Sequence, residues 1–372
     1  MPNLRSGLAT FVLTAVLSTS GLATVAANPI NNPMQDFDPM ARAAACSPRA
    51  GAVDYSDALD KLVYDDIQVG GLSGLAWDWR SHSYLTVVDN QDSEPSRLWS
   101  IGDDLSQPMP TGDPMVLTSP SGHAYTGETA DNEGLTVLPD GRYAVSSETE
   151  PSIRIFGRDG VQQGELKVPD RFRVAPDGQA ADNATLEGLT TSPDGGTVIA
   201  AMEGTLTGDT GDGNYRRLLV YTASHSKHRR HSEYRLTKQV GYRVDDGMRI
   251  SDVAAYGHGK LLILEAAYDE SIGNTIKLQS ADISDAPDVS GWSDLAYVPW
   301  AVVDKSLIAD VTDCPDLGAT SRELQSNPLM DNFEAMTVRR GRQHTYSISL
   351  LSDDNFNLPQ TTRILNLVAD LP

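Results

Sequence analysis

Short apolar runs separated by turn signals recur along most of the chain. The clearest of these runs lie at 143–146, 197–200 and 261–264, and each follows a turn that contains glycine. Asp-Gly and other glycine-rich turns between short β-prone runs are typical of β-hairpins. Beyond the N-terminus, no long segment shows the 3.6-residue period of an amphipathic helix. The pattern therefore predicts an all-β protein built from hairpins.

A four-residue pattern opens each repeat of these hairpins. It consists of a variable residue, then Ser or Glu, then a small residue or Asp, and then an aliphatic residue. The five copies are Leu72-Ser73-Gly74-Leu75, Asn132-Glu133-Gly134-Leu135, Leu186-Glu187-Gly188-Leu189, Ile250-Ser251-Asp252-Val253 and Phe333-Glu334-Ala335-Met336. Repeats of about fifty to eighty residues, each a small antiparallel sheet, indicate the blades of a β-propeller. Five blades are visible, and a sixth could lie between Thr275 and Asn332. A pair of β-sandwiches is the alternative, but the recurring opening pattern favours the propeller.

The last repeat shows three strands at most, and we expect the N-terminal part of the chain to supply its fourth. The segment around 61–69 is the predicted closing strand, and it would join the first and last blades. A closed ring has no exposed sheet edge, which is the physical reason for such a join. The only two cysteines, Cys46 and Cys314, predict one disulfide that reinforces the join. Two unrelated buried thiols are the alternative.

The N-terminus is typical of an export signal. Residues 7–27 are apolar or small, follow Arg5 and end in the cleavage-site sequence Val25-Ala26-Ala27. We therefore expect a signal peptide over 1–27, a flexible arm over 28–50 and a propeller domain over 51–372. An uncleaved membrane anchor is the alternative to cleavage. The predicted product is secreted, periplasmic or attached to the cell envelope, is monomeric, and has no stable membrane span after cleavage.

The chain carries a large excess of acidic residues. It has 51 Asp and Glu against 29 Lys and Arg, which gives a formal net charge of −22. Such a field repels nucleic acids and anionic membranes, so neither is an expected partner. It favours cations, or anionic ligands that are bridged by metal ions.

Acidic residues gather at two positions of the repeat. In a hairpin, the start of the first strand and the end of the second lie at the same edge, so their side chains should converge on one mouth of the central channel. The first-strand positions are Ser73, Glu133, Glu187, Ser251 with Asp252, and Glu334. The second-strand ends are Asp89, Glu148 with Glu150, Glu203, Glu265, and Asp353 with Asp354.

Carboxylates that are packed together repel one another, which creates a demand for a cation. Hard oxygen ligands in a roomy site suit Ca²⁺, whereas no Cys cluster or His pair indicates a softer metal. The predicted metal ligands are Glu133, Glu187, Glu334, Asp353, Asp354 and Asp89. The predicted general bases are Glu148, Glu203 and Glu265. The alternative is that these acids are scattered polar caps on a solvated face. A nucleophilic serine is not indicated, because Ser73 does not lie in a Gly-x-Ser-x-Gly sequence.

Three of these segments resemble the phytase-like family of bacteria, which is also described by the esterase-like activity of phytase. They run from Asn132 to Glu148, from Leu186 to Glu203 and from Asn332 to Phe356, and the resemblance covers roughly residues 65–370. The most specific part is Ser352-Asp353-Asp354-Asn355-Phe356. The resemblance implies an exported β-propeller-like fold, and the family name suggests phosphoester or carboxyl-ester hydrolysis. Members often carry Glu-Arg where this chain has Glu265-Ala266, and Ser-Glu where it has Ser251-Asp252.

Two functions are consistent with these observations. The first is a metal-dependent hydrolase, with Ca²⁺ as the metal, that acts on a small anionic substrate or another ester held through the metal. The second is a non-catalytic propeller that binds a ligand or a protein in the cell envelope, because one fold can host many unrelated tasks. The family resemblance favours the hydrolase, and the non-catalytic propeller is the alternative.

Overall fold

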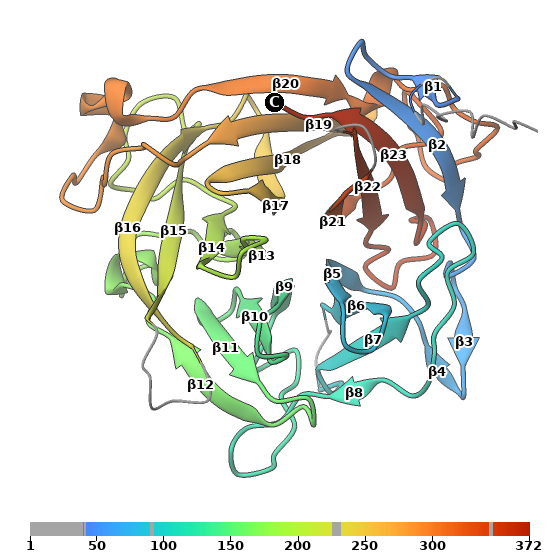
Figure 1. The fold of residues 1–372 in the computed structure, drawn as a ribbon, viewed down its shortest axis with the longest axis horizontal. Helices are drawn as coiled ribbons and strands as arrows, with labels where there is room; N and C mark the ends of the chain where they lie inside the picture. The colour runs from blue at the N-terminus through green and yellow to red at the C-terminus, as the bar shows by residue number, and fades with distance from the viewer. Residues whose placement is uncertain (1–39, 41, 90–92, 225–231, 342–344) are drawn as a thin grey trace, which may run out of the picture. The chain divides into compact units, whose positions relative to one another are not determined.

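The computed structural model describes residues 40, 42–89, 93–224, 232–341 and 345–372. The predicted signal peptide and residues 28–39 of the predicted arm lie outside these ranges. Of the six antiparallel sheets that the described residues form, five surround a central axis, so the protein is a five-bladed β-propeller (Figure 1). No helix among these residues has both the length and the apolar character to cross a membrane.

Four blades are built from four strands that follow one another along the chain. Blade one contains β5 (Leu72–Asp78), β6 (Ser83–Val88), β7 (Arg97–Ile101) and β8 (Met115–Val116). Blade two contains β9 (Asn132–Val137), β10 (Tyr143–Ser147), β11 (Ser152–Phe156) and β12 (Gln162–Leu166). Blade three contains β13 (Leu186–Thr191), β14 (Thr197–Met202), β15 (Tyr215–Ser224) and β16 (Glu233–Arg243). Blade four contains β17 (Arg249–Gly257), β18 (Lys260–Asp269), β19 (Gly273–Asp282) and β20 (Lys305–Asp310). A sixth blade is absent from the described stretch 275–332, which contains β20 and the short 3₁₀ turns η3 (Leu295–Tyr297), η4 (Pro299–Ala301) and η5 (Val311–Asp313).

The first strand of each repeat is the innermost strand of its blade. These inner strands, β5, β9, β13, β17 and β21 (Phe333–Arg340), contact one another in a ring around the axis (Figure 1). Crowding near the axis explains why the third position of the repeat is small. A Cβ atom added to Gly134 would lie 2.6 Å from the carbonyl oxygen of Glu187 in the next blade. In blade four this position holds Asp252, whose carboxylate accepts hydrogen bonds from the backbone nitrogens of Val253 and Met336, at 2.7 Å each.

The fifth blade combines the two ends of the described chain. Its strand order is β1 (Ala44–Ala45), β2 (Ala50–Ser56), β23 (Ile364–Asp370), β22 (Thr345–Ser352) and β21. The pairing of β2 with β23 runs from Ala50 with Ala369 to Ser56 with Ile364. Residues 44–50, which the sequence had assigned to the arm, therefore form β1, the turn that follows it and the first residue of β2.

The closing strand of the last blade was predicted around residues 61–69, and this predicted position is wrong. That segment forms a separate small hairpin, in which β3 (Val63–Tyr64) pairs with β4 (Ile67–Gln68). Asp65 and Asp66 take the left-handed conformation, with φ of 46° and 65°. Two consecutive residues with positive φ make a tight turn that folds the segment back on itself, so it cannot run on as one strand.

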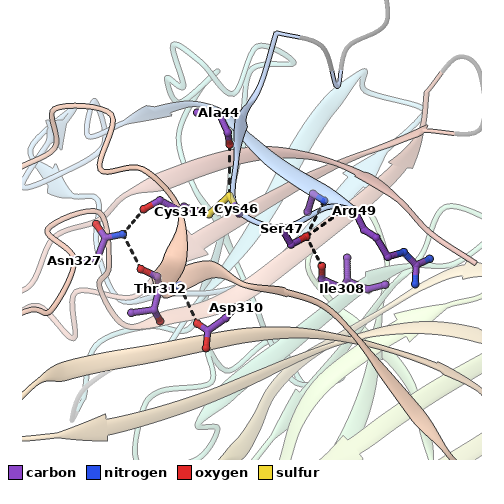
Figure 2. Close-up of a disulfide and its surroundings, with 10 residues drawn as sticks. Ala44, Cys46, Ser47, Arg49, Ile308, Asp310, Thr312, Cys314 and Asn327 are labelled. Atoms are coloured by element: carbon purple, nitrogen blue, oxygen red, sulfur yellow. Dashed lines mark hydrogen bonds between the residues drawn. A yellow bond between two sulfur atoms is a disulfide. The ribbon is translucent and has the colours of Figure 1, made fainter.

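The disulfide between Cys46 and Cys314 is present, as predicted (Figure 2). It joins the turn between β1 and β2 to the residue that follows η5, with 4.1 Å between the two Cα atoms. Beside it, the Ser47 hydroxyl donates to the carbonyl of Ile308 at 2.7 Å, and the Asn327 amide donates to the carbonyl of Cys314 at 2.7 Å (Figure 2). The bridge therefore links blade five to blade four, whereas the sequence had placed it at a join between the first and last blades.

Apolar side chains between neighbouring blades form the core. Between blades four and five, for example, Leu264 and Leu278 belong to the same buried cluster as Phe333 and Leu350. This packing fixes each blade against the next and holds the starts of the inner strands close together.

Candidate functional site

One repeated backbone contact brings the two acidic positions of a hairpin together. The residue after the second strand donates its amide hydrogen to the carbonyl of the residue before the first strand. This contact occurs in Asp89 to Gly71 (2.7 Å), Glu148 to Asp131 (2.8 Å), Glu203 to Thr185 (2.8 Å) and Asp353 to Asn332 (2.9 Å). Acids from blades one, two, three and five therefore lie at the same mouth of the channel.

These side chains surround a cavity of about 310 Å³. Six of the residues that line it are carboxylates, and they are Asp89, Glu133, Glu148, Glu187, Glu203 and Glu334. The remaining lining residues are Arg249, Asn183 and Asn355. The structure thus brings together most of the acids that the sequence selected, and they meet in a shared cavity.

Two groups of carboxylates lie close enough to share a cation. In the group of Asp89, Asp131 and Glu133, and in the group of Glu133, Glu148 and Glu187, the oxygens lie within 4.8 Å of one another. Glu133 belongs to both groups, and its Oε2 accepts a hydrogen bond of 2.8 Å from the Ser73 hydroxyl. Asp131 was not selected from the sequence, because it precedes the repeated pattern by one residue.

Burial and mutual repulsion make ionisation of these acids costly. Burial, followed by the neighbouring Asp131 and Asp353, raises the pKa of Asp89 to about 10. Burial and the charge of Glu203 raise the pKa of Glu148 to about 8. Burial and nearby carboxylates also raise the pKa of Glu133 and of Glu187 well above the usual range. At neutral pH these groups must hold protons or be balanced by a cation.

Asp353 carries an oxygen that lacks a hydrogen-bond partner. Its side chain is only 1% exposed, and its Oδ1 accepts a hydrogen bond of 2.7 Å from the backbone nitrogen of Asn355. Its Oδ2 has no partner among the described residues. Buried polar atoms are nearly always satisfied, so a carboxylate oxygen of this kind needs an explanation such as an ion. Asp353 is not among the residues that line the cavity, but its charge contributes to the raised pKa of Asp89. The oxygen donors of the carboxylates that do line it fit a hard cation such as Ca²⁺.

Among the described residues, Arg249 is the one cationic side chain that lines the cavity, and sequence reasoning missed it. It lies two residues before Ser251, at the start of β17. Side chains two apart along a strand point to the same face. Ser251 occupies the position at which three other repeats carry Glu, a side chain that should point into the channel. The sequence therefore contained a signal that Arg249, on the same face of the strand, also points there. The charges of Glu334, Glu187 and Glu203 outweigh the effect of burial and raise the pKa of Arg249.

Glu265 does not reach the cavity, and its prediction as a general base is corrected. In the other blades, the residue paired with the first residue of the pattern is Val88, Ser147, Met202 or Ser352. An acid follows each of them, and it lines the cavity in blades one, two and three. In blade four, Ile250 pairs with Glu265, so the position of the cavity acid is held by Ala266. A shift of one residue turns a side chain to the other face of the sheet. Glu265 is instead fully buried against Tyr242 (2.6 Å) and Lys305 (2.5 Å).

Asp354 was predicted to be a metal ligand, but it too lies outside the cavity lining. Its carboxylate accepts hydrogen bonds from Lys61 at 2.5 Å and from the backbone nitrogen of Gly71 at 2.9 Å. These contacts fasten the loop after β22 to blade one. Asp252 is likewise engaged by backbone nitrogens, and Glu150 lines a different cavity.

Fold and site together define a five-bladed β-propeller with a carboxylate-lined cavity at one mouth of its channel. A family model described as "Phytase-like: Esterase-like activity of phytase" matches residues 67–356. The chain belongs to this phytase-like family.

The chain is also similar in fold to several solved structures of low sequence identity. The PQQ-bound aldose sugar dehydrogenase of Streptomyces coelicolor is 11% identical, with 87% of this chain and 99% of that chain covered and a TM-score of 0.39. A protein of unknown function from Dyadobacter fermentans is 11% identical, with 87% and 100% covered and a TM-score of 0.43. An endo-arabinase of Bacteroides thetaiotaomicron is 12% identical, with 82% and 94% covered and a TM-score of 0.35. Likenesses at this level carry no functional argument, and no curated protein matches the chain.

Proposed function

We propose that the protein is a calcium-dependent hydrolase of phosphate or other esters that acts outside the cytoplasm. The observation that carries this proposal is the cavity itself, in which six carboxylates face a single guanidinium. A protein rarely gathers so many buried acids unless a cation or a reaction uses them. The family name and the disulfide, which favours an oxidising compartment, also support it. The predicted signal peptide remains part of the same proposal.

The residues divide into two roles. Asp89, Asp131 and Glu133 are the best-placed cation ligands, because their oxygens already lie within 4.8 Å of one another. Asp353 would complete the set with its unsatisfied Oδ2. A bound cation supplies charge that attracts the anionic oxygens of a substrate and lowers the pKa of water.

Glu148 is the proposed general base. It lines the cavity, and burial and the charge of Glu203 raise its pKa to about 8, within about one to two pH units of neutrality, as suits a general base. One of its oxygens accepts a hydrogen bond from the backbone nitrogen of Thr185, which holds the carboxylate in place. Glu203 lines the same cavity, but its carboxylate is engaged by Arg249 at 3.1 Å.

The test is hydrolysis of a panel of nitrophenyl phosphates and carboxyl esters, with calcium and with EDTA. We expect turnover that needs calcium and that falls by at least about a hundredfold in Glu148→Gln, in line with the loss of a general base. Asp104→Asn removes an exposed acid far from the cavity and should behave as the wild type. Absence of turnover on every ester in the presence of calcium would overturn the proposal.

Ligand binding without catalysis is the second candidate function. The opposite mouth of the channel holds a cavity of about 450 Å³, with Trp77 and Trp79 among its lining residues. A ligand held there would need none of the carboxylates. Calcium-dependent thermal stabilisation without hydrolysis, combined with unchanged ligand binding in Glu148→Gln, would favour this function over the first.

A further inference from the structure

We infer that Arg249 is a built-in counter-cation, which occupies one cation position of the carboxylate ring and confines the divalent ion to the side of blades one and two. The inference rests on the proposed cation site. It concerns how many ions the cavity accepts and what confines them to Asp89, Asp131 and Glu133, which the proposed function does not address.

The contacts of Arg249 resemble those of a bound metal more than those of a surface ion pair. Its Nη1 lies 3.2 Å from Glu187 Oε1 and 3.1 Å from Glu203 Oε1. Its Nη2 lies 2.8 Å from Glu334 Oε1 and 3.2 Å from Asn332 Oδ1. One guanidinium thus gathers three carboxylates from blades three and five.

Blade four, which carries this arginine, contributes no acid to the cavity. Its two acid positions are held by Ser251 and Ala266. The Ser251 hydroxyl instead donates to the carbonyl of Phe333 at 3.2 Å. A positive charge therefore replaces the acids in one blade of five. The ring is thus divided into an arginine side, where Glu187, Glu203 and Glu334 contact Arg249, and an acid-only side with Asp89, Asp131 and Glu133.

The acid-only side is the one that remains available to an ion. None of the hydrogen bonds or ion pairs described for Arg249 involves Asp89, Asp131 or Glu133. A divalent ion on the arginine side would have to lie beside the guanidinium, and like charges at such distances repel strongly in a partly desolvated site. With three carboxylates around it, Arg249 is also already neutralised, so it is poorly suited to binding a substrate anion.

Replacing Arg249 by an uncharged side chain should therefore open a second cation position. We would count calcium ions per chain by equilibrium dialysis and mass spectrometry, using full-length protein first stripped with EDTA. Arg249→Met should bind one more ion than the wild type, and its melting temperature should rise more on addition of calcium. Arg249→Lys keeps the charge and should bind the wild-type number.

Arg243→Met is the matched control, because it removes one positive charge from an exposed pair with Asp212 outside the cavity. An unchanged or smaller ion count in Arg249→Met, or an extra ion in either Arg249→Lys or Arg243→Met, would overturn the inference. If a calcium ion can take the place of the guanidinium, calcium should allow Arg249→Met to fold. An Arg249→Met chain that stays unfolded at every calcium concentration would therefore also overturn the inference. A different result would contradict the proposed function alone. In that result, the wild type binds no calcium ion and Arg249→Met binds one.

Discussion

Stripped of metal, the protein should lose stability as the pH rises from about 5.5 to about 7.5. The reason is that the folded cavity holds protons that the unfolded chain has already released. Glu148 titrates near 4.5 in an unperturbed chain and at about 8 in the folded protein, and Asp89 moves from 3.8 to about 10. A raised carboxyl pKa stabilises the fold at low pH, and this stabilisation is lost as the pH climbs toward the folded pKa.

The size of the effect follows from proton linkage. Each proton held by the folded state alone changes the free energy of unfolding by about 1.4 kcal/mol per pH unit. Neighbouring carboxyl groups share their protons, so we take a single net proton as the working figure. Over two pH units, this predicts a loss of about 3 kcal/mol in EDTA. Saturating calcium should remove most of the loss, because the ion stabilises the ionised carboxylates.

Urea unfolding followed by tryptophan fluorescence would measure this, since the chain contains five tryptophans. The four conditions are the two pH values, each with EDTA and with calcium. Glu148→Gln keeps an acceptor for the Thr185 nitrogen but cannot titrate, so its pH dependence in EDTA should be shallower. A free energy of unfolding in EDTA that is flat or rises over this range would refute the reasoning.

Three further predictions concern the fold. Replacing Cys46 and Cys314 by serine should lower the free energy of unfolding by about 2 to 5 kcal/mol, seen as a lower melting temperature than that of the oxidised wild type. Glu265→Gln should cost about 1.5 to 3 kcal/mol, because Lys305 loses its buried charged partner and keeps only Asp245 at 2.8 Å, yet calcium binding should persist in dialysis. A changed ion count there would contradict the placement of Glu265. Gly188→Ala should cost about 1 to 3 kcal/mol in urea unfolding, since its Cβ would lie 2.7 Å from a backbone nitrogen of the next inner strand. An unchanged midpoint would show that the inner strands can move apart.

The sequence predicted the blades well because each blade repeats one local pattern. Turn glycines and alternating apolar residues are local signals, and the small third position of the repeat reflects crowding at the axis. Gly134 shows this, because an added Cβ would meet the neighbouring inner strand. The closing strand was misplaced because its partner lies at the far end of the chain, and pairing of that kind leaves no local signature.

The site was predicted less completely because it depends on register. Glu265 was selected as the acid that ends a strand, but a difference of one residue turns it away from the channel and places Ala266 there. Arg249 is the cross-strand partner of Ala266. The family resemblance implies an arginine at the position of Ala266, and in this chain Arg249 supplies the charge from the opposite strand of the hairpin.

The shared construction of blade five has a consequence for how the nascent chain can fold. Strand β2 pairs only with β1 and β23, and β23 lies between β2 and β22 in the sheet. Since Ala50 pairs with Ala369, β2 must wait until the chain has been synthesised as far as β23. Contacts so distant along the chain form slowly, and a strand without its partner can pair with another molecule. Closure of the last blade should therefore be the step at which a delayed or truncated chain aggregates.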